Sequence, residues 1–228
     1  MKNLLAIAFL VVSLPLAFAQ NDDTPVQPDI PGDLVFDFGF NFLQENEGLE
    51  TQWFQSRSFS VYYMLTRKLN DYITVNPMLG ISSEKYDWDS ELNFMENDAR
   101  ELVYDTIQGV SVVKNRLAVN YVELPIEVRF FPWKTIEGEG LFIGIGGMIG
   151  GRFESHTKTQ YDAEGGQRRQ VKLRSSFGLE DIRYGVRGRI GLKGVNAFYK
   201  LYLSDLFRNS PVEQSPAAWT VGINFTGF

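Results

Sequence analysis

Isolated charged residues occupy alternate positions in several strand-like stretches, where apolar residues flank each of them. Alternate residues of a strand share one face, so these charges would point to one side of a sheet. Carboxylates and cationic side chains gathered on one face can neutralise one another, line a polar conduit or bind a small ligand. The residues concerned are Asp37, Glu123, Glu127, Arg129, Arg183, Arg187, Arg189 and Lys200.

The spacing of these charges along the chain favours mutual pairing. Two of the acids lie in "YVELPIEVRFF", residues 121–131, and three arginines lie in "RYGVRGR", residues 183–189. The stretch between them contains "GIGGMIGG", residues 144–151, whose glycines would let long side chains reach across. Buried charges must be paired and hydrogen-bonded, so we expect a salt-bridged network, with a conduit or ligand site as the alternative.

Other candidate chemistry is weak. The single histidine, His156, is next to Ser155, which points to the opposite face of a strand, and two residues from Glu154, which shares its face. The chain has no cysteine, which excludes thiolate nucleophiles, cysteine metal sites and a lipoprotein anchor. The acidic clusters lack the EF-hand pattern, and residues 144–151 lack the Lys-Ser/Thr ending of a phosphate-binding loop. We therefore predict no catalytic residues, no metal site and no cofactor.

The N-terminus has the pattern of a secretory signal. "MKNLLAIAFLVVSLPLAFAQ" contains one lysine, an apolar run and an Ala-x-Ala site before Gln20. We expect a signal peptide at 1–19, a flexible periplasmic leader at 20–33 and a β-barrel domain at 34–228. Removing Lys2 changes the formal net charge from -6 to -7, and an acidic exported chain is a poor candidate for nucleic-acid binding.

Most of the remaining chain shows the period-2 pattern of β-strands. A helical pattern occurs only in "SELNFMENDARELV", residues 90–103, which we place in a loop. The fourth and sixth expected strands change parity part-way, which a β-bulge or a change of environment would produce. The expected strands cover residues 34–43, 58–68, 72–88, 111–131, 140–156, 171–193, 196–207 and 217–228.

The connections between these strands alternate between long and short. Residues 44–57, 89–110 and 158–170 form long connections, whereas residues 69–71 and 193–196 form short ones. Residues 132–140 form a fairly short connection, and residues 208–215 form one of intermediate length. An outer-membrane barrel has short periplasmic turns, long extracellular loops and an even number of strands, so both termini are periplasmic. The alternation therefore predicts an all-β fold, a transmembrane antiparallel up-and-down β-barrel of about eight strands.

The two faces of the strands differ in a way that fits a membrane barrel. One face carries large apolar residues, and the other mixes glycine, serine, threonine and asparagine with the isolated charges. Aromatic residues gather at strand ends, as in an interfacial girdle. We therefore expect apolar side chains outside and a packed, polar lumen that contains the charge network.

Several of these segments resemble the PorT-like outer-membrane β-barrel proteins of the Bacteroidetes. The resemblance lies in "YVELPIEVRFF" with its inner Pro125, in "FGLEDIRYGVRGRIGL" at 177–192 and in the terminal "GINFTGF". It implies that Pro125 is tolerated mid-strand, at a bulge, and that the aromatic C-terminus is a signal for barrel assembly. The founding member of the group belongs to a secretion machinery.

These observations favour a non-enzymatic role in the cell envelope over two alternatives. We expect an integral protein of the cell outer membrane with a structural or interaction role, possible links to a secretion machinery, and outer-membrane lipid and an envelope protein as partners. The first alternative is a small pore or ligand-binding barrel, and the second is a lipid-modifying enzyme. The basic segment 167–174 is either a charged loop flank or a contact for lipopolysaccharide.

Overall fold

The structure is a computed structural model, and nearly all of its described residues belong to one compact unit, Gly32–Phe228. The expected signal peptide at 1–19 and most of the leader lie outside the described residues. The described ranges are 31–44, 51–88, 92–96, 102–106, 111–133, 140–163, 167–192, 194–208 and 215–227.

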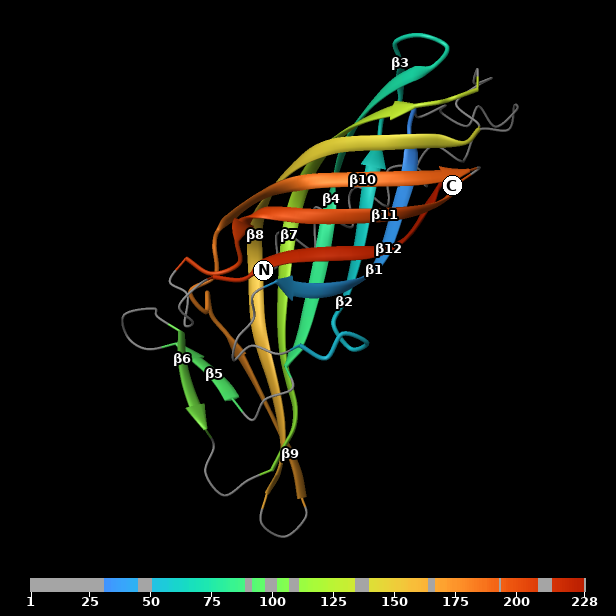
Figure 1. Cartoon of the computed structure of the whole chain (residues 1–228). Coiled ribbons are helices and arrows are strands. Elements are labelled where there is room, and N and C mark those ends of the chain that lie inside the picture. Colours follow the sequence, from blue (N-terminus) through green and yellow to red (C-terminus); the bar gives the residue numbers. More distant parts are fainter. Residues whose placement is uncertain are drawn as a thin grey trace, which may run out of the picture. The chain divides into compact units, whose positions relative to one another are not determined.

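Eight antiparallel strands close into a ring, because β10 pairs with β11 on one side and with β8 on the other. The first and last strands also pair, so β1 (blue) lies beside β12 (red) in Figure 1. Each strand otherwise pairs with its neighbour along the ring, which confirms the up-and-down antiparallel barrel. Its members are β1 (Asp33–Gln44), β2 (Arg57–Met64), β4 (Ile73–Trp88), β7 (Ser111–Phe130), β8 (Phe142–Ala163), β10 (Ile182–Leu192), β11 (Val195–Asp205) and β12 (Ala217–Thr226).

Four further strands lie outside this ring. The short β3 (Arg67–Lys68) pairs with β4, and β9 (Gln167–Arg174) pairs with the far part of β8. The helix-like pattern at 90–103 is misleading, because β5 (Leu92–Glu96) and β6 (Leu102–Thr106) form an antiparallel pair there. Among the described residues, no helix is long and apolar enough to cross a membrane.

The two parity changes have different causes. In β7 the odd-numbered residues face inward on both sides of the change, so the apolar residues switch parity because the lumen changes from apolar to polar, which is the expected change of environment. The register shift between Asn120 and Tyr121 adds a residue to β8 and leaves the faces of β7 unchanged. The expected strand at 171–193 is instead two strands, β9 and β10, separated by a turn in which Phe177 has a φ of 49° and Gly178 of 61°. A turn reorients the chain, so the residues after it need not keep the parity of those before it.

Pro125 is accommodated by a gap in strand pairing and not by the bulge that the resemblance implied. Between β4 and β7 the paired residues stop at Pro77↔Ile126 and resume at Gly80↔Glu123 with unchanged register. Proline has no N–H to donate to a ladder, so it fits where pairing is interrupted. Pro77 lies at the same gap on the opposite strand.

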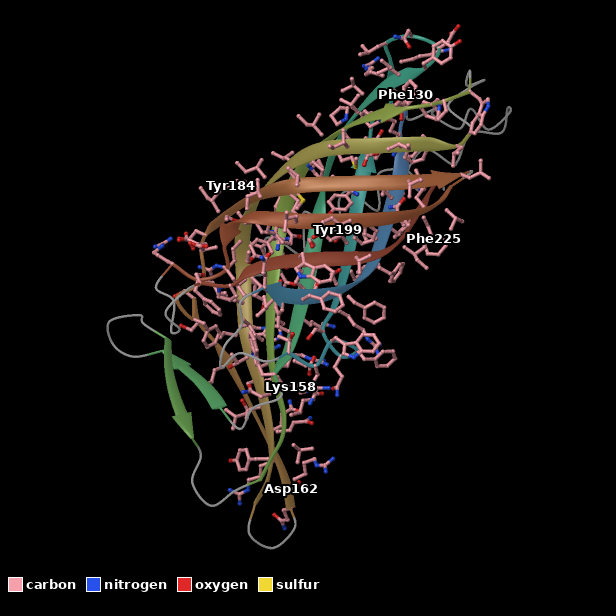
Figure 2. The ribbon with its side chains drawn as sticks, in the orientation of Figure 1. Phe130, Lys158, Asp162, Tyr184, Tyr199 and Phe225 are labelled. Atoms are coloured by element: carbon pink, nitrogen blue, oxygen red, sulfur yellow. The ribbon has the colours of Figure 1, made fainter. Side chains whose placement is uncertain are left out.

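The barrel has apolar side chains outside and charged side chains inside. Phe38 and Leu124 are 49% and 52% exposed, whereas Asp37 and Glu127 are completely buried. Phe130 and Tyr184 project away from the wall in Figure 2, and both are exposed. A soluble barrel would have the opposite arrangement, so this distribution of polarity suits a bilayer.

The lumen is not polar throughout, which corrects the expectation of a packed polar interior. Toward the long loops, a group of buried hydrophobic side chains, the apolar cluster, fills the lumen. The turn after β9 contributes Phe177 and Leu179 to this cluster. Leu117 and Val119 point inward there, on the same face of β7 as Glu123 and Glu127. Strand β8 continues past the ring and carries Lys158 and Asp162 on this extension (Figure 2).

Spin labels would test the outward direction of the apolar face. The chain has no cysteine, so single variants Phe38→Cys, Leu124→Cys and Ile223→Cys give unique attachment sites. In a bilayer we expect these labels to collide readily with dissolved oxygen and poorly with a water-soluble nickel complex, because they contact lipid. A label at Gln170 on the exposed β9 serves as the aqueous control. Nickel accessibility at Leu124 equal to that at Gln170 would contradict the arrangement.

Candidate functional site

The charged residues of the lumen are arranged in rungs across three neighbouring strands. Strand β8 lies between β7 and β10, and on three of its lumen-facing positions it has only glycine. On either side of each glycine is a charged residue, so the two charged side chains approach each other over a strip of bare backbone. The rungs are Glu123–Gly150–Arg183, Glu127–Gly146–Arg187 and Arg129–Gly144–Arg189.

The lumen-facing glycines of β8 have little room for a side chain, and at Gly146 the backbone of the neighbouring strand itself excludes one. A Cβ on Gly146 would lie 2.1 Å from the carbonyl oxygen of Ile126, and one on Gly144 would lie 3.0 Å from the carboxyl group of Glu127. Real Cβ contacts are not this short with backbone atoms. The glycine-rich sequence therefore sets the space in which the charged side chains meet.

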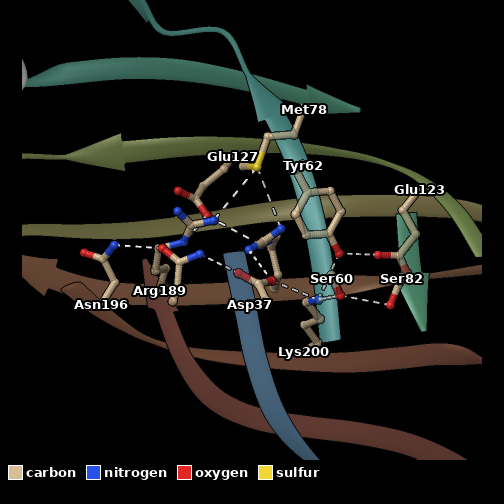
Figure 3. Close-up of polar contacts among 12 residues, drawn as sticks. Asp37, Ser60, Tyr62, Met78, Ser82, Glu123, Glu127, Arg189, Asn196 and Lys200 are labelled. Carbon is tan, nitrogen blue, oxygen red and sulfur yellow. Dashed lines mark hydrogen bonds and ion pairs between the residues drawn. The ribbon is translucent and has the colours of Figure 1, made fainter. Parts of the chain in front are cut away.

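Glu127 is the centre of the network toward the short turns. Its carboxylate lies 2.7 Å from Nε of Arg129, 3.2 Å from Nε of Arg189 and 3.5 Å from Nε of Arg187. Three guanidinium groups around one carboxylate give a buried cationic cluster with one shared counter-charge. Figure 3 shows Glu127 and Arg189 pointing toward one another within the barrel.

Asp37 connects the first strand to strands near the end of the chain. Its carboxylate lies 2.9 Å from Nζ of Lys200 and 3.4 Å from Nη2 of Arg187, and it accepts a hydrogen bond from the amide of Asn224. Lys200 also donates to the hydroxyl oxygen of Tyr62 at 3.0 Å (Figure 3). The ion pairs therefore extend across the lumen and are not confined to adjacent strands.

Arg183 lies at the end of the network toward the long loops, where it contacts two carboxylates and two aromatic rings. Its guanidinium pairs with Glu123 and, at 2.7 Å, with Glu84. It stacks between Tyr121 and Tyr202, with its Cζ 3.5 Å and 4.2 Å from the ring centroids. Planar guanidinium groups bind carboxylates and stack on aromatic faces at once, which a lysine cannot do.

Sequence reasoning missed Glu84 and the lumen tyrosines. Glu84 accepts hydrogen bonds from the hydroxyls of Tyr86 at 2.8 Å and Tyr202 at 2.6 Å. Its parity is that of the polar residues Thr74, Asn76 and Ser82, so the period-2 pattern contained the signal. The tyrosines were harder to assign, because their rings suit lipid as well as a lumen whose acids accept their hydroxyls.

All eight charged residues proposed from the sequence lie in the lumen and take part in ion pairs with one another or with Glu84. The space beside Arg183, Tyr86 and Tyr202 is about 10 Å³, which is at most one water molecule. Within the described ranges, no group of three or more potential metal ligands occurs. The arrangement is a filled ionic network.

The turn between β9 and β10 is fastened at the long-loop end by Asp181. Its carboxylate accepts hydrogen bonds from Arg208, at 2.6 Å, and from Arg152. These hydrogen bonds, with that from Arg208 the larger, hold the pKa of Asp181 below its usual value. The same turn inserts Phe177 and Leu179 into the apolar cluster, so the Asp181 contacts secure the cover over the lumen.

His156 lies on the part of β8 beyond the ring. Its Nδ1 is 3.9 Å from the carboxylate of Glu154, and the hydroxyl of Ser155 donates to the carbonyl oxygen of Ser175. Burial, together with the charge of Lys172, lowers the pKa of His156. Ser155 is buried on the opposite face, so the two side chains do not form a nucleophile and base pair.

Comparisons with known proteins give one family and several solved structures. The family whose description is "Outer membrane protein beta-barrel domain" matches residues 18–208. Ail, the attachment invasion locus protein of Yersinia pestis, is 12% identical over 87% of this chain and 100% of its own, with a TM-score of 0.37. A mutant porin from Rhodopseudomonas blastica is 11% identical over 86% of this chain and 99% of its own, with a TM-score of 0.20. A search of curated proteins finds no match.

Neutralising Glu127 would test the central role of this carboxylate. In Glu127→Gln, three buried arginines lose their shared counter-charge, and breaking a buried pair in this way costs about 3–5 kcal/mol. The free energy of unfolding in urea and detergent should fall by that amount. Asp162→Asn, which breaks the exposed pair with Arg168, is the control and should change it by less than about 1 kcal/mol. Equal effects of the two variants would contradict the assignment.

Two adjacent glycines of β8 provide a matched test of the close approach. Gly146→Ala places a methyl group against the backbone of β7, whereas nothing lies within 4 Å of a Cβ on Gly147. We expect Gly146→Ala to destabilise the barrel by about 1–3 kcal/mol, as overpacking does, and Gly147→Ala to be neutral or slightly stabilising. Thermal unfolding midpoints of the two variants, measured side by side, would show the difference.

Proposed function

We propose that this chain, which belongs to the outer membrane protein β-barrel domain family, has a non-enzymatic structural or interaction role in the cell envelope. The observation that carries the proposal is the filled lumen. Asp37, Glu127, Arg187 and Lys200 are all buried within one connected network, and the apolar cluster closes the half above it. A barrel that neither conducts nor encloses a ligand acts through its wall and its loops.

The strand order supports an orientation with both termini in the periplasm. Strand β1 begins, and strand β12 ends, on the side of the barrel that carries the short connection between β10 and β11. Short turns of outer-membrane barrels face the periplasm. The proposal includes cleavage of residues 1–19, for which N-terminal sequencing of the mature protein should give Gln20 first.

The surface available to a partner is the extension formed by β8 and β9. All residues of β9 are exposed, and it includes Arg168, Arg169, Lys172 and Arg174. Two of these cations are engaged within the ribbon, Arg168 by Asp162 and Arg174 by Glu154. We propose an envelope protein or outer-membrane lipid as the partner of this ribbon, and no nucleic acid.

The resemblance to PorT-like proteins of the Bacteroidetes suggests a finer proposal, an accessory role beside a secretion machinery. It is supported only by the segments 121–131, 177–192 and 222–228. Crosslinking from Arg169→Cys on the ribbon in intact outer membranes, followed by identification of the captured protein, would test it. Val221→Cys on the lipid-facing wall is the control for random capture.

The pore and the enzyme alternatives each require a different structural feature. A pore needs a continuous aqueous path, and the buried ion pairs of the lumen together with the apolar cluster argue against one. A lipid-modifying enzyme needs a nucleophile or base facing the bilayer, and the His156 geometry does not provide one. An enzyme would also change the mass spectrum of lipid A when the protein is expressed, and we expect an unchanged spectrum.

Planar-bilayer recordings test the filled lumen directly. We expect the purified protein to give no reproducible conductance steps, because ion pairs and aromatic rings occupy the cross-section. Arg187→Gly, which removes a large side chain from the middle of the lumen, should be the variant that begins to conduct if it still closes into a barrel. Conductance steps in the native protein that change in ion selectivity in Arg187→Gln would establish the pore instead.

A further inference from the structure

An apolar groove of about 620 Å³ lies on the outer wall, over the strands β12, β1, β2 and β4. Its sides are aromatic rings. The centroids of Phe38 and Phe59 are 4.9 Å apart, those of Phe38 and Phe225 are 6.2 Å apart, and those of Phe40 and Phe54 are 5.9 Å apart. Other lining residues, Gly39, Ser58, Ser83 and Gly222, have little side-chain volume, so the wall is hollowed between the rings.

Two cations, Arg57 and Lys85, also line this groove, at its end toward the long loops. Ser58 pairs with Glu84, so continuing the register by one residue sets Arg57 directly opposite Lys85. Like charges at directly opposite positions of paired strands repel one another. Among the described residues, no carboxylate forms an ion pair with either cation. Within the described part of the wall, two neighbouring positive charges thus lie without a counter-charge.

The position of Arg57 is fixed by its neighbour Phe54. Its Nε donates to the carbonyl oxygen of Phe54 at 3.0 Å, and its Cζ lies 5.0 Å from the centroid of the Phe54 ring. No hydrogen-bond acceptor among the described side chains contacts its terminal nitrogens. Because outward residues nearer the short turns on β2 and β4 are apolar, including Phe59, Leu79 and Ile81, the two cations lie where the hydrocarbon layer ends.

We propose that this groove binds one molecule of a phosphorylated glycolipid of the outer leaflet, the lipid A part of lipopolysaccharide. An acyl chain lies along the aromatic groove, and a phosphate lies between Arg57 and Lys85. Both features of the groove match this lipid. Its phosphate would reduce the repulsion between the two cations, and its acyl chain would fill the apolar hollow. The inference rests on the proposed orientation, in which the long-loop end faces the outer leaflet.

Native mass spectrometry of the full-length mature protein, released from detergent with added lipid, tests the site. The probes are bis-phosphorylated lipid A, the same lipid without phosphates, phosphatidylglycerol and inorganic phosphate. Arg57→Gln/Lys85→Gln removes the cations, and Ser83→Trp fills the groove and keeps them. Arg169→Gln/Lys172→Gln removes two exposed cations from the β9 ribbon and is the matched control. Heat-modifiable electrophoretic mobility checks that each variant closes into a barrel.

We expect Arg57→Gln/Lys85→Gln to bind phosphorylated lipid A about 30-fold more weakly, at about 1 kcal/mol for each cation. Ser83→Trp should also bind weakly, and the ribbon control should bind like the native protein. The proposal is overturned if the lipid lacking phosphates binds equally well, if inorganic phosphate displaces the lipid, or if only the ribbon variant loses binding. A preference for phosphatidylglycerol would overturn the choice of lipid.

Orientation is measured separately, so its failure can be recognised. A membrane-impermeant maleimide should label Gln170→Cys on the ribbon in intact cells. Labelling only after the outer membrane is opened would contradict the proposed orientation, and loss of lipid binding with normal labelling would contradict the groove alone.

Discussion

The constraint on which this structure depends is that charged side chains cannot face hydrocarbon. A bilayer accepts the outward face only if it is apolar, so every charge at the depth of the hydrocarbon layer must be neutralised inside the ring. In a lumen this narrow, arginines can reach carboxylates only if the strand between them has no side chains in the way. Gly144, Gly146 and Gly150 provide that space, and the ion pairs over them fill what would otherwise be a water-filled cross-section.

Because ion pairs and apolar side chains fill the lumen, the proposed role assigns partner binding to the outer surfaces of the barrel. The ribbon of β8 and β9 offers exposed cations to the aqueous side, and the groove beside Phe38 offers an apolar hollow with two cations to the membrane side. The two surfaces are built differently. Acids accompany some of the ribbon cations, whereas Arg57 and Lys85 form no ion pair within the described ranges, which is why the groove is the stronger candidate for an anionic lipid.

Most of the fold was readable from the sequence because one period governs both faces of a strand. Phe36 to Phe42 on one face and Asp37 on the other predict the wall of a membrane barrel before any pairing is known. The pairing partners were not readable, because they depend on register: Glu84 and Arg183 meet only after two strands between them are aligned. The apolar cluster was missed because an apolar residue suits lipid as well as an apolar part of the lumen, and Leu117 and Val119 lie on the same inward face of β7 as Glu123 and Glu127. The helical spacing at 90–103 gave a wrong indication, because two paired strands of five residues each are too short to show a clear period-2 pattern.

The contacts of Asp37 also govern how such a chain can enter a membrane. This residue belongs to the first strand, and its cationic partners belong to β10 and β11, about 150 residues later. If the sheet were inserted strand by strand, the Asp37 carboxylate would enter the lipid without its cationic partners. It would stay unpaired until β10 and β11 had joined the barrel. Insertion and closure are therefore coupled for this sequence, and the last strands must be delivered before the first can be left in the bilayer.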